Sequence, residues 1–222
     1  MSKSVTQNNQ NNCESGAVLI SPHLSASSQV KSPLQLGVMA SGSGTNFAAV
    51  AKAIAQGKLN AEIKVLIYNN PRAKVKERAE EYHIPSVLLD HRAYQSRKDL
   101  DQKIVAVFKT YGVDWVIMAG WMRITTQVLL DGYPNRVINI HPSLLPSFKG
   151  IKAIEQALQA KVKITGCTVH LVSLEVDSGE IIMQAAVPVL SDDTLDTLHA
   201  RIQVQEHQIL PQAIAIAASQ SS

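Results

Sequence analysis

Residues 139–146, with the sequence NIHPSLLP, contain two side chains suited to chemistry on a carbonyl group. Alternate residues of a strand share one face, so Asn139 and His141 should point the same way, about 6.5–7 Å apart. An amide N–H can hold a developing oxyanion, and an imidazole beside it can move protons. Pro142 should end strand pairing. On spacing alone, an Asn that caps a loop and a structural His remain an open alternative.

A second candidate site is the turn SGSGTN at residues 41–46, between a predicted strand and a predicted helix. Its glycines permit a tight turn, and free N–H groups at a helix start attract phosphate. The turn begins like a dinucleotide fingerprint, but Phe47 replaces the third glycine and no acidic residue ends the next strand. A monophosphate site is therefore favoured. In the alternative, Thr45 or Asn46 merely caps the helix.

A third polar segment, AGWMRIT at residues 119–125, also follows a predicted strand. Trp121 and Met122 offer flat, adaptable apolar surface, and Arg123 could pair with a carboxylate. A flat heteroaromatic ligand would suit such a wall, although core packing is the more common use of these residue types.

An imidazole that moves protons needs a carboxylate to hold its charged form. Glu175 and Asp177 are available in the sequence EVDSG. Asp177 is followed by Ser and Gly, which is typical of a turn aspartate. Spacing alone does not bring it near His141, so its participation cannot be derived from the pattern.

The elements that must position these residues are strands alternating with helices. This alternation predicts an α/β fold, a mostly parallel twisted sheet with helices on both faces. Ligands bind such sheets beyond the carboxyl ends of the strands, where all three polar segments should meet. Segments 165–176 and 179–189 predict a late antiparallel hairpin. A final helix over 193–218 contains Pro211, which is expected to kink or break it. The predicted strands are 34–40, 62–68, 85–89, 113–120 and 135–140, and the predicted helices before the hairpin are 47–57, 73–84, 97–112, 125–132 and 151–160.

Length and composition limit the possible domain organisation and the class of protein. The chain has 222 residues, 45% of them hydrophobic, and a formal charge of +3. We predict a disordered N-terminal tail over 1–34, rich in Ser, Asn and Gln, and one domain over 35–218. The two cysteines, Cys13 and Cys167, are too far apart in sequence for a typical zinc pattern. No clustered basic stripe, membrane-length apolar run or secretory segment is present, so we expect a cytoplasmic protein without nucleic-acid or membrane partners.

Five segments occur together and in order: ASGSGTNF, AGWMRI, INIHPSLLPSF, GCTVHLVSLEVDSGEII and QVQEH. As a set, over residues 34–217, they resemble the phosphoribosylglycinamide formyltransferases, folate-dependent enzymes of purine synthesis. The NIHPSLLP segment is shared with other enzymes that transfer or hydrolyse folate formyl groups. SGSGTN is more specific to the ribonucleotide enzymes.

The resemblance implies a role for each matching residue. His141 resembles the proton donor, Asn139 the partner of the formyl oxyanion, and Asp177 the acid that supports the charged histidine and helps a proton leave through water. The implied ribonucleotide-binding residues are Gly44, Thr45, Asn46, Gln203 and Glu206. The implied folate-binding residues are Arg97, Met122, Arg123, Ile124, Thr125, Asn139, Ser173, Leu174, Glu175, Val176 and Asp177. Two departures from the family pattern, Lys149 and Ser178, lie in loops and put contacts there in doubt.

The implied reaction is attack of the glycinamide amine on the formyl carbon of 10-formyltetrahydrofolate, a cosubstrate. No metal and no tightly bound cofactor are expected, and the protein would be a monomer or homodimer. One alternative is formyltetrahydrofolate hydrolysis, although those relatives usually carry an N-terminal regulatory domain. Methionyl-tRNA formylation normally needs a further C-terminal domain. A nucleotide-binding module without activity is disfavoured by the joint presence of Asn139, His141 and Asp177.

Overall fold

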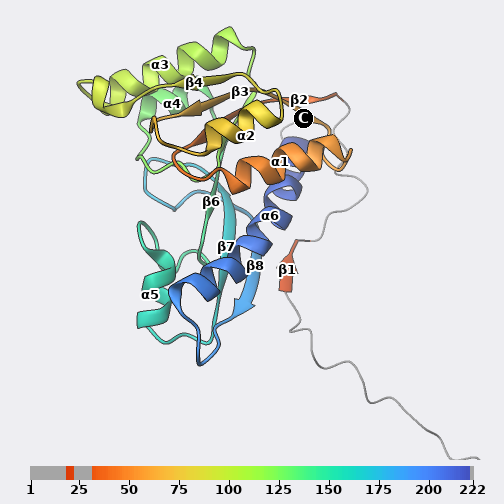
Figure 1. The fold of residues 1–222 in the computed structure, drawn as a ribbon, viewed down its shortest axis with the longest axis vertical. Helices are drawn as coiled ribbons and strands as arrows, with labels where there is room; N and C mark the ends of the chain where they lie inside the picture. The colour runs from red at the N-terminus through yellow and green to blue at the C-terminus, as the bar shows by residue number, and fades with distance from the viewer. Residues whose placement is uncertain (1–18, 23–31, 221–222) are drawn as a thin grey trace, which may run out of the picture.

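The computed structural model describes residues 19–22 and 32–220. Its centre is one eight-stranded sheet with the order β1-β8-β7-β6-β5-β2-β3-β4 (Figure 1). The strands are β1 (Leu19–Ser21), β2 (Leu34–Ala40), β3 (Ala61–Tyr68), β4 (Ser86–Leu88), β5 (Trp115–Met118), β6 (Val137–His141), β7 (Ile164–Leu171) and β8 (Ile181–Pro188). The helices are α1 (Thr45–Ala55), α2 (Val75–Glu81), α3 (Arg97–Thr110), α4 (Gln127–Gly132), α5 (Ala153–Gln159) and α6 (Leu195–Gln220), with a short 3-10 turn η2 (His91–Ala93).

The parallel part of the sheet runs β6-β5-β2-β3-β4. All four residues of β5 are buried, as expected for a parallel strand covered on both sides. β7 pairs antiparallel with both β6 and β8, so the predicted late hairpin is confirmed. The structure therefore confirms a mostly parallel α/β sheet with an antiparallel extension.

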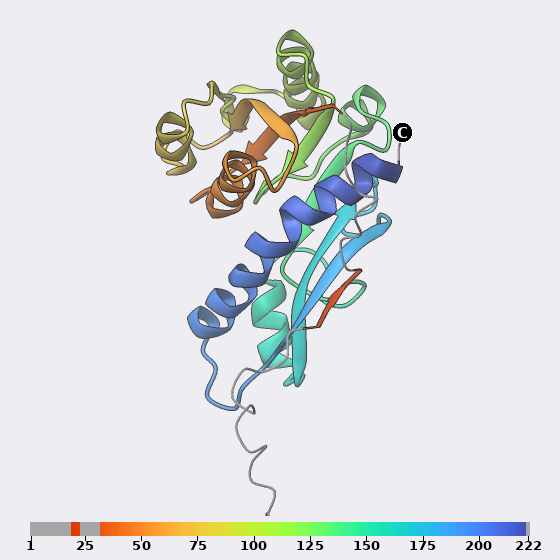
Figure 2. The ribbon, with the colours of Figure 1, turned by 90° about the vertical axis from the view of Figure 1, so that its right-hand side faces the viewer.

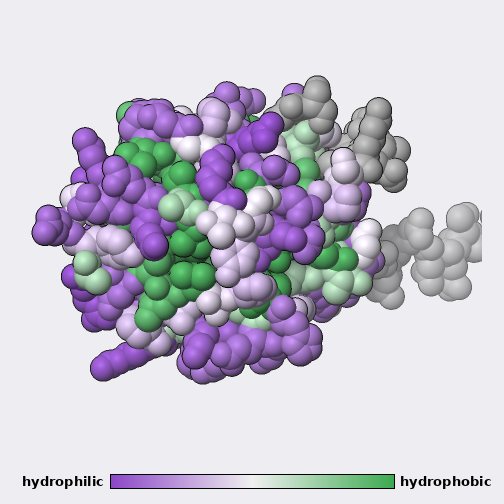
Figure 3. Space-filling view, turned by 90° about the horizontal axis from the view of Figure 1, so that it is seen from above, coloured by the Kyte–Doolittle hydropathy of each residue, from purple (hydrophilic) through white to green (hydrophobic). Residues whose placement is uncertain are grey.

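Helices cover both faces of the sheet through two separate hydrophobic clusters. Residues of α1, α2, α5 and α6 pack in one cluster, and residues of α3 and α4 pack in the other. Ile138 and Ile140 of β6 belong to the first cluster and Val137 to the second, which confirms the predicted alternation along this strand. Figure 2 shows α6 lying obliquely across β7 and β8. Seen from above, charged and polar side chains form most of the outline and hydrophobic residues show between them (Figure 3).

Local signals fix several element ends. A capping box starts α3, in which the Ser96 hydroxyl accepts from the N–H of Asp99 at 3.2 Å and the Asp99 carboxylate accepts from the N–H of Ser96 at 2.9 Å. The predicted break at Pro211 is wrong, because α6 continues through this residue to Gln220. Ile209, Leu210 and Ile214 are fully buried around the proline, and this packing holds the helix together despite one missing backbone donor.

The predicted N-terminal disorder is wrong for three residues. Leu19–Ser21 form β1, which pairs antiparallel with β8 and places Ile20 opposite Ala185. A short apolar segment near an open sheet edge gains backbone hydrogen bonds by adding a strand there. Residues 1–18 and 23–31 of the predicted tail lie outside the described part of the chain.

Candidate active site

Three loops meet at the carboxyl edge of the parallel sheet. β6, β5 and β2 are neighbours and run parallel, so residues 139–146, 119–125 and 41–46 leave the sheet on the same side. The N–H of Ser41 donates to the carbonyl of Gly120 at 3.0 Å, and the N–H of Met122 donates to the Ser41 hydroxyl at 2.9 Å. The predicted convergence of the polar segments is therefore present.

A buried hydrogen-bond network holds the loop that follows β6. Thr168 on β7 is fully buried and sits opposite His141. Its hydroxyl donates to the carbonyl of Ser143 at 2.7 Å and accepts from the N–H of Leu145 at 3.1 Å. The Gln184 amide donates to the same hydroxyl at 2.9 Å and to the Leu145 carbonyl at 3.0 Å. These hydrogen bonds therefore fix the loop at the end of β6 to the neighbouring strands β7 and β8.

His141 is only 5% exposed, and its imidazole has an oxygen atom near each ring nitrogen. Nδ1 lies 3.3 Å from Oδ2 of Asp177. Nε2 lies 2.9 Å from the backbone carbonyl oxygen of Phe148. A charged imidazolium can donate to both oxygens at once, whereas a neutral ring can donate to only one. The geometry therefore suits a histidine that carries a proton toward a substrate.

Asp177 reaches His141 because the connection between β7 and β8 folds back over the sheet. The strand predicted over 165–176 instead ends at Leu171, so residues 172–180 form a long connection within the hairpin of β7 and β8. The N–H of Val172 donates to the carbonyl of Val137 at 2.8 Å as the chain turns away. A Cβ on Gly179 would come within 1.7 Å of the Leu171 carbonyl oxygen, so this close return requires glycine.

The surroundings of Asp177 keep its carboxylate ionised. Burial by itself raises the pKa of Asp177, but the neighbouring His170 ring, the N–H of Gly150 and the charge on His141 together outweigh burial and lower the pKa below its ordinary value. The Gly150 N–H donates to Oδ2 at 2.8 Å. The carboxylate therefore stays charged through the neutral range. Its contribution to stability is present above the unfolded-state pKa and is lost as pH falls through the lower folded-state value.

Sequence reasoning missed His170, which lies beside both Asn139 and Asp177. This histidine is 2% exposed, and its Nε2 is 3.2 Å from Nδ2 of Asn139 and 3.6 Å from Oδ1 of Asp177. Its Nδ1 lies 2.8 Å from the Leu171 carbonyl oxygen and can donate to it. Nε2 can accept from the Asn139 amide when the ring is protonated at Nδ1 alone, and it can donate to Asp177 when it carries a proton itself. The available signal was the strand pairing that places His170 opposite Asn139.

The turn before α1 joins α1 to α6 through its side chains. Gln203 of α6 donates to the Thr45 hydroxyl at 3.1 Å, and Asn46 donates to the Glu206 carboxylate at 2.9 Å. Neither Thr45 nor Asn46 caps the helix, because Gly44 is the N-cap and no side chain caps it. Burial raises the pKa of Glu206, and the Asn46 hydrogen bond offsets this only in part. The structure thus brings together the residues that the resemblance assigned to the ribonucleotide.

Gly44 should be the least replaceable residue of this turn. It has φ +73°, and a Cβ there would lie 2.3 Å from a methyl group of Val75 on α2. We expect Gly44→Ala to lower the free energy of unfolding by about 2–4 kcal/mol. Alanine is strained in the left-handed backbone conformation, and its Cβ would overlap the Val75 side chain. Gly42→Ala is the matched control, since a Cβ there meets no atom within 4 Å. Urea denaturation of both variants tests this, and equal stabilities would contradict it.

The residues assigned to the folate lie on two loops, on strand β6 and at the first turn of α3. Loop 119–125 is fixed to α3 because the N–H of Thr126 donates to the Asp101 carboxylate at 2.6 Å, one turn after Arg97. Lys149 pairs with Glu175 at 3.2 Å and also contacts Ser178, which links the loop after β6 to the loop that carries Asp177. Several assigned apolar side chains are exposed to solvent: Met122, Ile124, Leu174 and Val176. Their contact with a folate remains a prediction.

Met122 offers the clearest test of this apolar surface, because the residue is 76% exposed. We expect Met122→Asp to raise the KM for the folate about tenfold or more. Burial of the methionine side chain against a ligand ring stabilises the complex by roughly 1.5–3 kcal/mol, and a charged carboxylate cannot provide this apolar contact. The KM for the ribonucleotide should change little. Met122→Leu is the control that keeps an apolar contact. An unchanged folate KM in steady-state assays would remove Met122 from the pocket.

Two further kinds of feature are absent from the described residues. No group of three or more His, Cys, Asp or Glu side chains within 19–22 and 32–220 is placed to hold a metal ion. No helix in the same part of the chain is both long and apolar enough to cross a membrane.

Comparison with known proteins agrees with this geometry. The sequence profile of the formyl transferase family matches residues 34–214. The chain is 40% identical over 180 residues to phosphoribosylglycinamide formyltransferase of Bacillus subtilis, covering 81% of this chain and 92% of that protein. It is also 40% identical to the human trifunctional purine biosynthetic protein adenosine-3, covering 85% of this chain but only 19% of that protein.

Solved structures show the same relationship in three dimensions. Glycinamide ribonucleotide transformylase 1 from Symbiobacterium toebii superposes with a TM-score of 0.83 at 43% identity, covering 85% of this chain and 89% of that chain. Phosphoribosylglycinamide formyltransferase from Bacillus halodurans gives a TM-score of 0.81 at 41% identity, covering 85% and 97% of the two chains. On its fold, its site and these matches, the chain belongs to the formyl transferase family.

Proposed function

We propose that this protein transfers the formyl group of 10-formyltetrahydrofolate to the amine of 5-phosphoribosylglycinamide, a step of purine biosynthesis. The observation that carries the proposal is the contact between His141 and Asp177, whose nearest side-chain atoms are 3.3 Å apart. This pair lies near Asn139, at the same edge of the sheet as the turn at residues 41–46. The names of the Bacillus subtilis and Symbiobacterium toebii relatives support the same activity.

In this proposal the substrate amine attacks the formyl carbon and a tetrahedral oxyanion forms. The Asn139 amide and protonated His141 stabilise the oxyanion, which develops charge only after attack. Nδ1 of His141 faces Asp177, so Nε2 is the nitrogen that turns to the formyl oxygen, replacing its contact with the Phe148 carbonyl. The bond from the formyl carbon to N10 of the folate then breaks. The attacking amine loses one proton and N10 gains one, with water as the relay.

The two substrates would approach from different loops. Gly44, Thr45 and Asn46, with Gln203 and Glu206, hold the ribonucleotide end, where two side-chain hydrogen bonds already join α1 to α6. The folate lies against Met122 and the neighbouring loop residues. The remaining folate contacts in this proposal are Arg97, Arg123, Ile124, Thr125, Asn139, Ser173, Leu174, Glu175, Val176 and Asp177.

A formyl-transfer assay tests the activity directly. Purified full-length protein is mixed with 10-formyltetrahydrofolate and glycinamide ribonucleotide, and release of the deformylated folate is followed by absorbance. Folate deformylation should require the ribonucleotide. A parallel reaction without the amine measures hydrolysis, and equal rates with and without the amine would assign the protein to the hydrolases instead. No turnover in either reaction would contradict both enzymatic assignments.

The wider properties of the protein follow from the same proposal. Residues 35–218 form the catalytic domain, and the folate acts as a cosubstrate that leaves after each turnover rather than as a bound cofactor. The protein works in the cytoplasm as a monomer or homodimer on small-molecule substrates, without a metal ion. We expect the N-terminal segment before residue 35 to be dispensable for activity.

A further inference from the structure

Two loops contact the His141 ring, and a pair of side chains outside the proposed reaction joins these loops. The loop after β6 places the carbonyl of Phe148 2.9 Å from Nε2. The connection between β7 and β8 places the carboxylate of Asp177 3.3 Å from Nδ1. Lys149 and Ser178 are the next residues of the chain after these two, and the Lys149 ammonium donates to the Ser178 hydroxyl. The two contacts of the ring are therefore connected to each other one residue further on.

Both residues that contact the ring have a left-handed backbone conformation. The φ angle is +55° at Phe148 and +51° at Asp177, and neither residue is a glycine. A residue with a Cβ atom is strained in this conformation, and it stays there only where surrounding contacts hold it. The position of the Phe148 carbonyl and of the Asp177 carboxylate therefore depends on the contacts that fix the two loops.

Helix α5 fixes the backbone on both sides of Gly150. The Gln156 amide donates to the carbonyl of Lys149 at 3.3 Å and to the carbonyl of Ile151 at 2.9 Å. Between these two residues, the N–H of Gly150 donates to Oδ2 of Asp177 at 2.8 Å. The backbone that carries the Lys149 side chain is thus held by a helix and also contacts the Asp177 carboxylate.

The Lys149 side chain reaches from this fixed backbone to the connection between β7 and β8. Its ammonium contacts the Ser178 hydroxyl and lies 3.2 Å from the Glu175 carboxylate. The Ser178 hydroxyl in turn donates to the carbonyl of Val176 at 3.0 Å, so contacts hold the chain on both sides of Asp177. The Glu175 side chain is 77% exposed, and an ion pair of this kind stabilises little by itself. The contact with Ser178 is therefore the more important of the two.

We propose that Lys149 is a positioning residue, which acts through Ser178 to hold the Asp177 carboxylate against the His141 ring. Lys149, Ser178 and Glu175 form a clasp between the two loops. The inference rests on the proposed function, in which Asp177 supports the protonated imidazole. Without the clasp, the backbone at Asp177 is free to leave its left-handed conformation, and the carboxylate moves away from Nδ1. A displacement of about 1 Å at a reaction centre can cost on the order of 10²-fold in rate.

Hydrogen exchange of the Gly150 amide in the full-length protein, followed by NMR, tests the clasp without requiring turnover. The Gly150 N–H is bound to Asp177, so its exchange reports when the two loops separate. We expect Lys149→Met, which keeps the aliphatic stem and removes the cation, to speed this exchange about tenfold or more. Lys149→Arg keeps the cation and should exchange slowly, as the wild type does.

Lys152→Met is the matched control for this measurement. Lys152 lies at the end of the same loop, and its ammonium pairs with Glu155 of α5 at 3.0 Å. The substitution removes the same charge without removing a contact to the connection between β7 and β8, so exchange at Gly150 should stay slow. Unchanged exchange in Lys149→Met, or equal acceleration in Lys152→Met, would overturn the inference.

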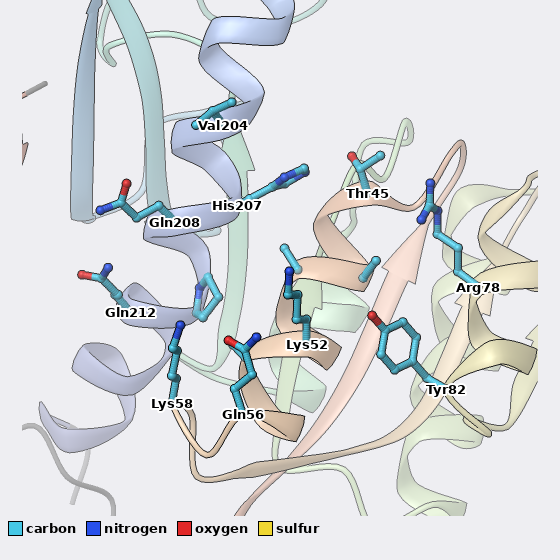
Figure 4. Close-up of a pocket in the computed structure, with 14 residues that line it drawn as sticks. Thr45, Lys52, Gln56, Lys58, Arg78, Tyr82, Val204, His207, Gln208 and Gln212 are labelled. Atoms are coloured by element: carbon cyan, nitrogen blue, oxygen red, sulfur yellow. The ribbon is translucent and has the colours of Figure 1, made fainter. Parts of the chain in front are cut away.

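Formyl-transfer kinetics form the second arm. At saturating folate, we expect Lys149→Met to lower kcat about 5- to 20-fold and Lys149→Arg to retain most of the wild-type rate, because the carboxylate is displaced only in the first variant. The KM for the ribonucleotide should stay unchanged. Neither Lys149 nor Ser178 lines the cavity of about 610 Å³ that begins at Thr45, between α1 and α6 (Figure 4). A rise in this KM with an unchanged kcat would overturn the positioning role.

The double variant Lys149→Met, Asp177→Asn distinguishes positioning from a separate effect of Lys149. If Lys149 acts through Asp177, the double variant should be no slower than Asp177→Asn alone. Fully multiplicative losses, or a wild-type kcat in Lys149→Met, would overturn the inference and leave the proposed function intact. Faster exchange at Gly150 in Lys149→Met, in a protein that shows no formyl transfer, would support the clasp and refute the proposed function.

Discussion

Replacing His141 with alanine is expected to lower kcat by at least 10²–10³, about 3–4 kcal/mol of transition-state stabilisation. The imidazole is the group that donates to the formyl oxygen, and no other side chain among the described residues has the same contact with Asp177 Oδ2, at 3.3 Å. Substrate affinities should change little, because the donor acts on charge that develops during the reaction. Single-turnover rates at saturating substrates measure the effect.

Asp177 should lose most of its importance once His141 is gone. Its carboxylate acts largely through the imidazolium, so the double variant His141→Ala, Asp177→Asn should be little slower than His141→Ala alone. The single variant Asp177→Asn should still be slow. Because Asp177 also accepts from the Gly150 N–H at 2.8 Å, the thermal stability of each variant has to be measured alongside. Fully multiplicative losses in folded variants would mean that Asp177 works independently, and the coupled mechanism would have to be withdrawn.

Asn139→Ala is the second substitution with a large expected effect. Loss of one oxyanion donor typically costs 10²–10³ in kcat, roughly 3–4 kcal/mol. Asn139→Asp should be at least as slow, since a carboxylate places negative charge where the oxyanion forms. Both variants should bind the two substrates with near-normal affinity.

His170 provides a check on the orientation of the Asn139 amide. Its Nε2 lies 3.2 Å from Nδ2 of Asn139, so His170→Ala frees the amide to rotate. We expect a drop in kcat for this variant and little further loss when Asn139→Ala is added. Single-turnover rates of the two single variants and the double variant distinguish orientation of the Asn139 amide from a purely structural role of His170.

For the Asn139 prediction itself, wild-type single-turnover rates in Asn139→Ala would show that the oxyanion is stabilised elsewhere.

Local patterns in the sequence were sufficient for the parallel part of the sheet and for one pair of site residues. Side chains alternate along a strand for steric reasons that depend only on the backbone, so the shared face of Asn139 and His141 was predictable. Apolar strands alternating with helices likewise required a parallel sheet whose carboxyl ends meet at one edge. The capping box of α3, formed by Ser96 and Asp99, is equally local.

Tertiary contacts decided the rest, because they join residues that no local pattern relates. Asp177 reaches His141 only because the chain leaves β7 at Leu171 and folds back, and His170 meets Asn139 only through the register of β6 and β7. Burial of neighbouring side chains keeps α6 continuous at Pro211, against its local propensity. Arg78 likewise contacts the turn before α1 from a different helix. In each case the arrangement is stabilised by packing or hydrogen bonds between segments that are distant in sequence. Periodicity and residue type do not show which distant segments will meet.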